Sequence, residues 1–193
     1  NVSMLRSRGV QFVGPAEGEQ ACGEVGAGRM SEPQEIIDVL VAQSLPQVLA
    51  GKKILITAGP TFEDIDPVRF IGNRSSGKMG FALAAAARAM GADVTLVAGP
   101  VSLSTPFNVS RTNVRNAAQM REAVLAALPN QDVYIGAAAV ADFTPTAKAA
   151  QKIKKTEGCL DLDLVPTADI LSEVAAHLLR PKCVVGFAAE TEQ

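Results

Sequence analysis

The sequence has no tryptophan, one tyrosine and a single histidine, His177. Because the ordinary pKa of histidine lies near neutrality, mechanisms that need a histidine base have one candidate here. His177 follows a helical pattern with Val174 and Leu178, which favours a structural or surface position over a catalytic one. We therefore do not expect His177 to be a catalytic residue.

Cysteine is also scarce: Cys22, Cys159 and Cys183 are widely spaced and form no C-x-x-C pair. This excludes a disulfide framework and a cysteine zinc site, and it fits a reducing cytoplasm, where we expect the protein. No apolar run approaches the roughly 18–20 residues that span a bilayer, and no signal-peptide core is present. A membrane partner is not expected.

Charge of one sign is lacking as well, since the net charge is −2 with no strongly basic face. Nucleic acid is therefore not an expected partner. Hydrophobic residues make up 48% of the 193 residues, enough for one full domain and an additional segment. The chain begins without Met and stops after a strand-like segment, so we expect both ends to be cut.

Residues 1–50 differ from the rest. They begin with a Gly-rich sequence for which we expect irregular structure. One helix is then predicted, with Ser31 as N-cap and Pro33 and Glu35 in its first turn. Its apolar positions are Ile36, Ile37, Leu40 and Val41. Residues 44–52 are typical of a linker, so we expect a domain boundary after residue 50.

From residue 51 the pattern alternates between strands and helices. Buried strands are predicted at 53–59, 93–99, 132–139 and 182–190, with a short strand at 109–114. Helices are predicted from Ser76 to Met90 and at 117–128 and 168–179. The buried stripe of the first is expected at Met79, Leu83, Ala87 and Met90. This alternation predicts a Rossmann-like α/β fold with a doubly wound, mainly parallel sheet.

One insertion interrupts the alternation at 152–165, KIKKTEGCLDLDLV. Leucines alternate with aspartates after a short basic run and a Gly turn, which predicts a β-hairpin that covers a site or makes a dimer contact. The lysines suit either a solvated strand edge or a mobile clamp for a triphosphate. Sequence alone leaves both open.

The segment GNRSSGKM (72–79) is one residue short of a P-loop. Met79 replaces the Ser or Thr that would bind Mg²⁺, and about a dozen residues separate the loop from the preceding strand, so it is not a Walker A motif. The glycine spacing of a Rossmann dinucleotide turn is missing too. Ser75, Ser76 and Gly77 at a helix start suit an anion site, or Ser76 simply caps the helix.

Three predicted strands end in small residues: ITAGPT (56–61), IGAAAVAD (135–142) and VGFAAE (185–190). Ligands of open α/β sheets bind outside the carboxyl ends of strands, and small residues let a ligand approach the backbone. The alternative is that they only allow close helix packing. Asp142 follows one of these ends, where it suits a ribose hydroxyl, a metal, or an ordinary turn.

Together with DPVRFIGNRSSGKMGFALA (66–84), KIKK (152–155), VPTADIL (165–171) and GFAAET (186–191), these segments resemble phosphopantothenoylcysteine synthetase. The resemblance covers residues 53–193 in order. ACGEVGAGRMSEP (21–33) resembles the substrate clamp that closes phosphopantothenoylcysteine decarboxylase. The order of the two matches is similar to that of the bifunctional coenzyme A biosynthesis proteins. It implies a decarboxylase tail with a linker in residues 1–50 and a C-terminally truncated synthetase domain in 51–193.

The resemblance implies a CTP-dependent ligase with Mg²⁺. The carboxylate of 4′-phosphopantothenate attacks the α-phosphate of CTP, giving an acyl-cytidylate and pyrophosphate, and the amine of cysteine then displaces CMP. Such chemistry needs positioning and charge neutralisation more than a protein nucleophile. A homodimer through the synthetase domain is implied, with a higher oligomer in the fused protein.

Residue roles implied by the resemblance fall into two groups. Asn73 would lie at the activated carboxyl, Arg69 would hold substrate, and Lys152 would reach the triphosphate across the dimer interface. The nucleotide would contact Gly136, Ala137, Ala138, Asp142, Val165, Pro166, Thr167, Ala168 and Phe187, and Ser75, Ser76 and Gly77 would hold a phosphate.

For the decarboxylase half, the resemblance implies that Cys22 is the proton donor and that FMN binds to a part of the parent protein upstream of this sequence. Only the intact parent would decarboxylate. Triphosphate-binding lysines that follow GFAAET in the family lie beyond Gln193. A nicotinamide-dependent reductase and a non-catalytic nucleotide-binding module remain as rival functions, and CTP against ATP preference stays open.

Overall fold

The structure, a computed structural model, describes residues 1–19, 25–155 and 159–188. The chain divides into two compact units, Asn1–Pro46 and Gln47–Gln193. Within the described ranges, no helix is long and apolar enough to cross a membrane.

The first unit contains helix α1 (Val2–Ser7), an antiparallel pair of strands, β1 (Ala16–Glu19) and β2 (Val25–Arg29), and helix α2 (Pro33–Ser44). The expectation of an irregular N-terminal segment is therefore wrong for the described residues.

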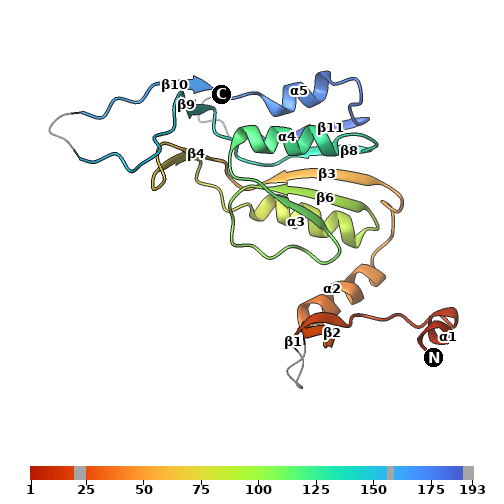
Figure 1. Cartoon of the computed structure of the whole chain (residues 1–193). Coiled ribbons are helices and arrows are strands. Elements are labelled where there is room, and N and C mark those ends of the chain that lie inside the picture. The colour runs from red at the N-terminus through yellow and green to blue at the C-terminus, as the bar shows by residue number, and fades with distance from the viewer. Residues whose placement is uncertain (20–24, 156–158, 189–193) are drawn as a thin grey trace. The chain divides into compact units, whose positions relative to one another are not determined.

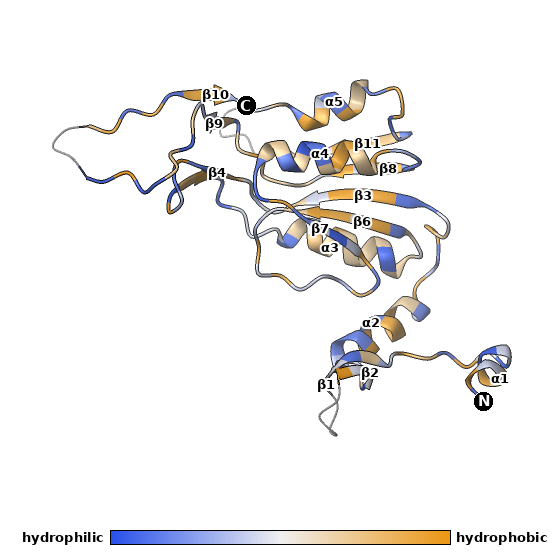
Figure 2. Cartoon of the chain, viewed as in Figure 1, coloured by the Kyte–Doolittle hydropathy of each residue, from blue (hydrophilic) through white to orange (hydrophobic). Residues whose placement is uncertain are grey.

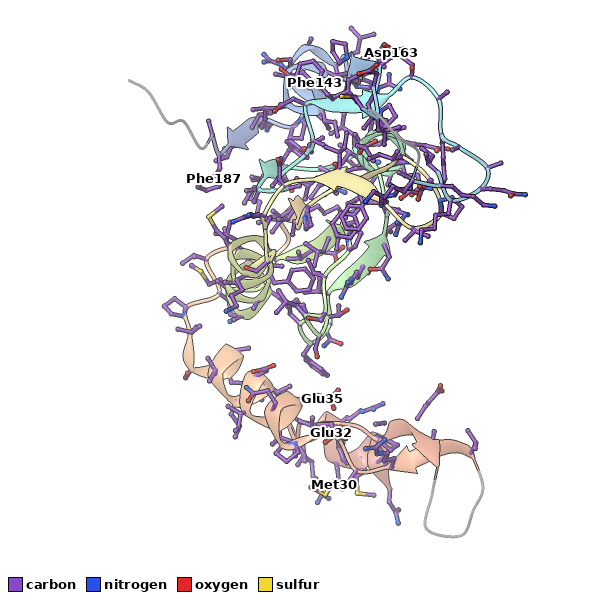
Figure 3. The ribbon with its side chains drawn as sticks, turned by 90° about the vertical axis from the view of Figure 1, so that its left-hand side faces the viewer. Met30, Glu32, Glu35, Phe143, Asp163 and Phe187 are labelled. Carbon is purple, nitrogen blue, oxygen red and sulfur yellow. The ribbon has the colours of Figure 1, made fainter. Side chains whose placement is uncertain are left out.

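Helix α2 also begins differently from the prediction. Its N-cap is Glu32, not Ser31: Glu32 and Glu35 form a reciprocal capping box (Figure 3), and the Ser31 residue is buried. The carboxylate of Glu32, one residue later, accepts from a backbone N–H of the first turn, the bond that the serine hydroxyl was expected to accept.

The second unit is built on a five-stranded parallel sheet. Its strands, in spatial order, are β11 (Cys183–Gly186), β8 (Val133–Gly136), β3 (Lys53–Ala58), β6 (Asp93–Ala98) and β7 (Ser110–Asn113). The chain therefore builds outward from β3 through β6 to β7, then returns to the other side of β3 for β8 and β11. This is the Rossmann strand order, with a topological switch point between β3 and β8.

Helices cover both faces of this sheet (Figure 1). Helix α3 (Lys78–Ala89) packs on one face, and α4 (Ala117–Ala127) and α5 (Ile170–Ala176) lie on the other. Alternate side chains of β3 point to opposite faces of the sheet. Ile54 and Ile56 pack in the core with α3, whereas Leu55 packs in the core with α4. Figure 2 shows the resulting concentration of hydrophobic residues in β3 and β6. The predicted doubly wound fold is confirmed.

The predicted start and buried face of α3 need correction. The N-cap is Gly77 with φ 73°, and the helix starts at Lys78. Its buried residues are Gly80, Phe81, Ala84 and Ala87, whereas Met79 is exposed. Because Gly80 packs directly on β3, the face that meets the sheet is displaced by one residue from the one expected at Met79 and Leu83.

An antiparallel pair that the sequence did not reveal, β4 (Phe62–Asp64) and β5 (Phe70–Gly72), follows β3. The rings of Phe62 and Phe70 stack with centroids 3.9 Å apart. Glu63 and Asp66 in this segment are buried acids, which conceals the strand pattern. Glu63 accepts a hydrogen bond from the Ala117 backbone N–H (2.8 Å), so this acid is satisfied at the start of α4.

The insertion is a ribbon, but with other strands than predicted. Strand β9 (Phe143–Pro145) pairs antiparallel with β10 (Leu164–Pro166), and they enclose the connection 146–163 (Figure 1). In the described part of the connection, residues 152–155 and 159–163 are not in strands, so the expected KIKK–LDLDL pairing is wrong. Leucines at 160 and 162 are exposed, since no sheet face receives them.

Candidate functional site

The carboxyl ends of β3 and β8 form a backbone-lined floor at the switch point. A parallel bridge between Pro60 and Ala139 continues the pairing beyond both strands. The Ala139 N–H donates to the Gly59 carbonyl (2.9 Å), and the Thr61 N–H donates to the Ala139 carbonyl (3.3 Å). The segment after β8 is thus held extended over the end of β3, where a doubly wound sheet binds its ligands.

Two buried threonines fix this segment from below. The Thr57 hydroxyl accepts from the Ala138 N–H (3.3 Å), and the fully buried Thr61 hydroxyl accepts from the Ala141 N–H (2.9 Å). A buried hydroxyl costs desolvation free energy unless it is hydrogen-bonded, so these contacts account for polar residues at this point in the core. Sequence reasoning missed both; the only signal was the place of Thr57 inside the apolar run of β3.

Asn73 lies at the same floor. Its Nδ2 donates to the carbonyl of Val140 at 2.9 Å, and its side chain is exposed. The structure therefore brings Asn73 to the segment after β8 although 67 residues separate the bonded pair. An amide with one N–H fixed by the backbone presents its other polar groups in a set direction.

The predicted nucleotide loop around Thr167 joins the site from the other side. The Thr167 hydroxyl donates to the Ala141 carbonyl (2.6 Å), and its N–H donates to the Asp142 carbonyl (2.8 Å). Asp142 is exposed. The flanking Val165, Pro166 and Ala168 are exposed as well.

Residues of β8 and β11 complete this edge of the sheet. The Phe187 N–H donates to the Gly136 carbonyl (3.2 Å), and the exposed Phe187 ring follows the end of β11 (Figure 3). Gly136, Ala137 and Ala138 are half-buried, so their backbone is within reach of a bound molecule.

The candidate phosphate loop begins at the same edge. A Cβ on Gly77 would lie 3.3 Å from the Gly59 Cα, which places the start of α3 against the end of β3. The Ser75 hydroxyl accepts from the Gly77 N–H (3.3 Å), and Ser76 is exposed. Ser76 is not the N-cap, so of the two readings of this residue the capping one is wrong.

Arg69 and Lys152 lie outside this group of residues. Arg69 pairs with the buried carboxylate of Asp66 (Nη2 to Oδ2 2.7 Å) and also donates to the Ile153 carbonyl (2.6 Å). Lys152 is exposed in the 146–163 connection, next to that contact. The structure thus links Arg69 and Lys152 to each other through Ile153.

A second acid of the β4–β5 pair, Asp64, holds the same connection. It accepts from Arg115 (2.7 Å) and from Lys148 (2.6 Å), and the Arg115 guanidinium also lies over the rings of Phe62 and Phe70. The hydrogen bonds from Arg115, then those from Lys148, lower the pKa of Asp64 from 3.8 to about 2. Because its pKa is lowered on folding, Asp64 stabilises the fold above pH 4 and ceases to do so as the pH falls through about 2.

Asp64→Asn is expected to lower the free energy of unfolding at pH 7 by about 1–2 kcal/mol, the full shift being reduced by solvent screening of the exposed partners. The difference from the unsubstituted protein should shrink to about half by pH 3. Urea unfolding at pH 7, 4 and 3 measures it, with the exposed Asp93→Asn as control. A difference that stays constant with pH would contradict the ion-pair account.

The described residues hold no group of three or more His, Cys, Asp or Glu side chains suited to a metal. Cys22 lies outside the described residues, so its role as a proton donor stays a prediction. His177 ends α5, and its Nδ1 accepts from the Leu179 N–H (3.1 Å), which agrees with a structural position.

The strand order defines a Rossmann-like domain, and the backbone-lined floor at its switch point is the candidate ligand site. A family model, the DNA/pantothenate metabolism flavoprotein C-terminal domain, matches residues 49–193. The chain belongs to this family.

Curated relatives and solved structures agree with that membership. The coenzyme A biosynthesis bifunctional protein CoaBC of Vibrio parahaemolyticus is 53% identical over 99% of this chain and 48% of the relative. The chain thus spans about half the length of the curated relatives it matches. A crystal structure of the C-terminal domain of a CoaBC protein is 45% identical, with a TM-score of 0.64 over 74% of this chain and 67% of that one. A Cab2 mutant in complex with phosphopantothenate-cysteine shares the fold at 19% identity and a TM-score of 0.63, over 84% of this chain and 73% of that one.

Proposed function

We propose that this chain carries the phosphopantothenate–cysteine ligase of a bifunctional coenzyme A biosynthesis protein, and that it works in the cytoplasm with CTP. The observation that carries the proposal is the bond from Asn73 to Val140, which joins two of the segments that carry the resemblance, 66–84 and 135–142, at one switch point. Family membership and the named relatives support it.

The reaction has two steps. The carboxylate of 4′-phosphopantothenate attacks the α-phosphorus of the nucleotide and expels pyrophosphate, forming an acyl-cytidylate. The cysteine amine then attacks the acyl carbon, CMP leaves, and the amine loses its proton as the amide forms. Each step needs reactants held in line and growing negative charge met by fixed donors, which is what a rigid backbone floor and an oriented amide supply.

Roles follow from position. Asn73, oriented by Val140, donates to the acyl oxygen as charge develops there. Backbone groups of residues 136–138 read the base, with Phe187 beside it, and Asp142 binds a ribose hydroxyl or a metal. The loop from Val165 to Ala168 closes the nucleotide site. The amides and hydroxyls at Ser75, Ser76 and Gly77, at the positive end of α3, hold the substrate phosphate.

Lys152 reaches the triphosphate of a second copy in a homodimer, on this proposal. The connection that bears it extends away from the five-stranded sheet in Figure 1, which supports action on another subunit. Exposed apolar side chains on the ribbon, Phe143, Leu164 and Val165, supply surface for the contact. Arg69, whose Nη2 is engaged by Ile153, would hold substrate with its remaining donors.

Mg²⁺ would enter with the nucleotide phosphates, since it favours phosphate oxygens and water over a full protein cage. Residues 1–50 would be the tail of an FMN-dependent decarboxylase with Cys22 as proton donor, active in the intact protein only, where a higher oligomer is expected.

The test is CMP release from the full-length protein with 4′-phosphopantothenate, Mg²⁺ and either CTP or ATP, with and without cysteine. Release that requires cysteine and CTP is expected. Nucleotide binding without turnover would favour the non-catalytic module, and oxidation of NADPH without CMP release would favour the reductase.

A further inference from the structure

Three contacts, besides the hydrogen bond from Arg69 to the Ile153 carbonyl, fasten the 146–163 connection to the β4–β5 pair. Lys148 bonds to Asp64, the Ala149 N–H donates to the Ile65 carbonyl (2.9 Å), and the Ile153 N–H donates to Asp66 (3.1 Å). The connection is therefore not held only at its ends by β9 and β10. The last of the three contacts adjoins Lys152.

Asp66 has a side chain with no exposed surface and is satisfied on both oxygens. Its Oδ1 accepts from the Val68 and Arg69 N–H groups (both 2.8 Å), and its Oδ2 accepts from the Arg69 guanidinium and from Ile153. Burial opposes its ionisation, but the N–H groups of Val68, Ile153 and Arg69 and the guanidinium outweigh burial and lower its pKa. A buried, ionised carboxylate this well bonded is a rigid anchor.

Asp66 and Arg69 form hydrogen bonds with both backbone polar groups of Ile153. Asp66 accepts from the Ile153 N–H, and the Arg69 Nη2 donates to the Ile153 carbonyl (2.6 Å). The N–H of Ile153 belongs to the peptide unit that follows Lys152, so the backbone of Lys152 is fixed on that side. The Ile153 residue is partly buried, whereas Lys152 itself is exposed.

We propose that Asp66 is a positioning residue for the ligase reaction: with Arg69 it clamps Ile153 and so aims Lys152 at the nucleotide triphosphate. This rests on the proposed function of Lys152. A fixed backbone leaves only the lysine side chain to be ordered when the nucleotide binds, which reduces the entropy lost in reaching the phosphates. Asp66 contacts no reactant and acts through the connection.

The test compares Asp66→Asn, Lys152→Ala and their double variant in the full-length protein. Asparagine keeps an acceptor for the Val68 and Arg69 N–H groups but turns a donor toward Ile153. Pyrophosphate release from CTP should fall about 10- to 100-fold in Asp66→Asn. The KM for 4′-phosphopantothenate should stay within about twofold in Ile153→Pro, a variant that leaves the pair of Asp66 with Arg69 in place. The double variant should be no slower than Lys152→Ala alone, because the clamp has then lost the group it positions.

Two further variants separate positioning from folding. Ile153→Pro deletes the clamped N–H and leaves the buried carboxylate with its other donors, so it should reproduce the kinetic pattern even if Asp66→Asn folds poorly. Asp161→Asn removes an exposed carboxylate from the same connection and should be neutral.

Losses that multiply in the double variant, or full activity in folded Asp66→Asn, would overturn the clamp. Full activity in Lys152→Ala would overturn it as well, together with the role of that lysine, while leaving the ligase assignment intact. An unsubstituted protein that releases no pyrophosphate with either nucleotide would instead refute the proposed function.

Discussion

Asn73→Asp is expected to lower cysteine-dependent amide formation by about 10²- to 10³-fold, the usual cost of losing one donor to a developing oxyanion. The carboxylate would replace the Nδ2 that donates to Val140, and two oxygens would face each other across 2.9 Å. It would also present negative charge to the substrate carboxylate and to the acyl-cytidylate, so forming or passing on that intermediate should be impaired.

Steady-state ligation, with pyrophosphate release measured in parallel, identifies the step that fails. Asn130→Asp is the matched control, because Asn130 is exposed in the turn between α4 and β8, at φ 66°, a conformation that aspartate also tolerates. Equal thermal unfolding of both variants would exclude a folding defect. Retention of more than half the activity by Asn73→Asp would contradict the role of the amide.

Gly99→Ala is expected to have the largest effect on stability, lowering the free energy of unfolding by about 3 kcal/mol through overpacking. Gly99 follows β6 and is buried, and a Cβ there would lie 1.7 Å from the carbonyl oxygen of Pro60. The atoms that the Cβ would meet belong to the backbone of Pro60 and not to a flexible side chain, so the ends of β3 and β6 would have to separate. The bridge from Pro60 to Ala139 that forms the floor of the site would shift with them.

Urea unfolding at pH 7 measures this effect. Gly136→Ala serves as the control for stability, since its Cβ would meet nothing closer than 3.4 Å and should cost about 1 kcal/mol or less. If the free energy of unfolding of Gly99→Ala lay within about 0.5 kcal/mol of that of the unsubstituted protein, the two strand ends would not be packed as described.

The long buried strands were predictable because a short, continuous apolar run that ends in glycine favours a buried strand. Residues 53–59 and 93–99 are largely apolar runs that end in glycine, and they became β3 and β6 with small changes at their ends. The candidate site was placed by the rule that ligands bind at the carboxyl ends of strands, and the structure brings several of the predicted residues together there. That Asn73 reaches Val140 did not follow, since the contact depends on how β5 leads into α3.

Two of the segments that the sequence did not reveal share a physical cause: their partners are distant in sequence. Asp66 can be buried because N–H groups of Arg69 and Ile153 donate hydrogen bonds to it. Ile153 is 87 residues away, so the local sequence does not predict this donor. The alternation of leucine and aspartate at 160–164 suggested a strand, but only Leu164 pairs, and it pairs with Pro145. A hydrophobic period of two residues predicts which side chains share a face of a strand, but it does not show that a partner strand is available for pairing.

The most direct test of the central claim is pyrophosphate release from CTP by the full-length protein, with 4′-phosphopantothenate and Mg²⁺ but without cysteine. We predict release that depends on 4′-phosphopantothenate and stops near one equivalent per site, because the acyl-cytidylate stays bound until an amine arrives. A well-folded protein that releases no pyrophosphate with either CTP or ATP would contradict the claim, and the site between β3 and β8 would then need another ligand.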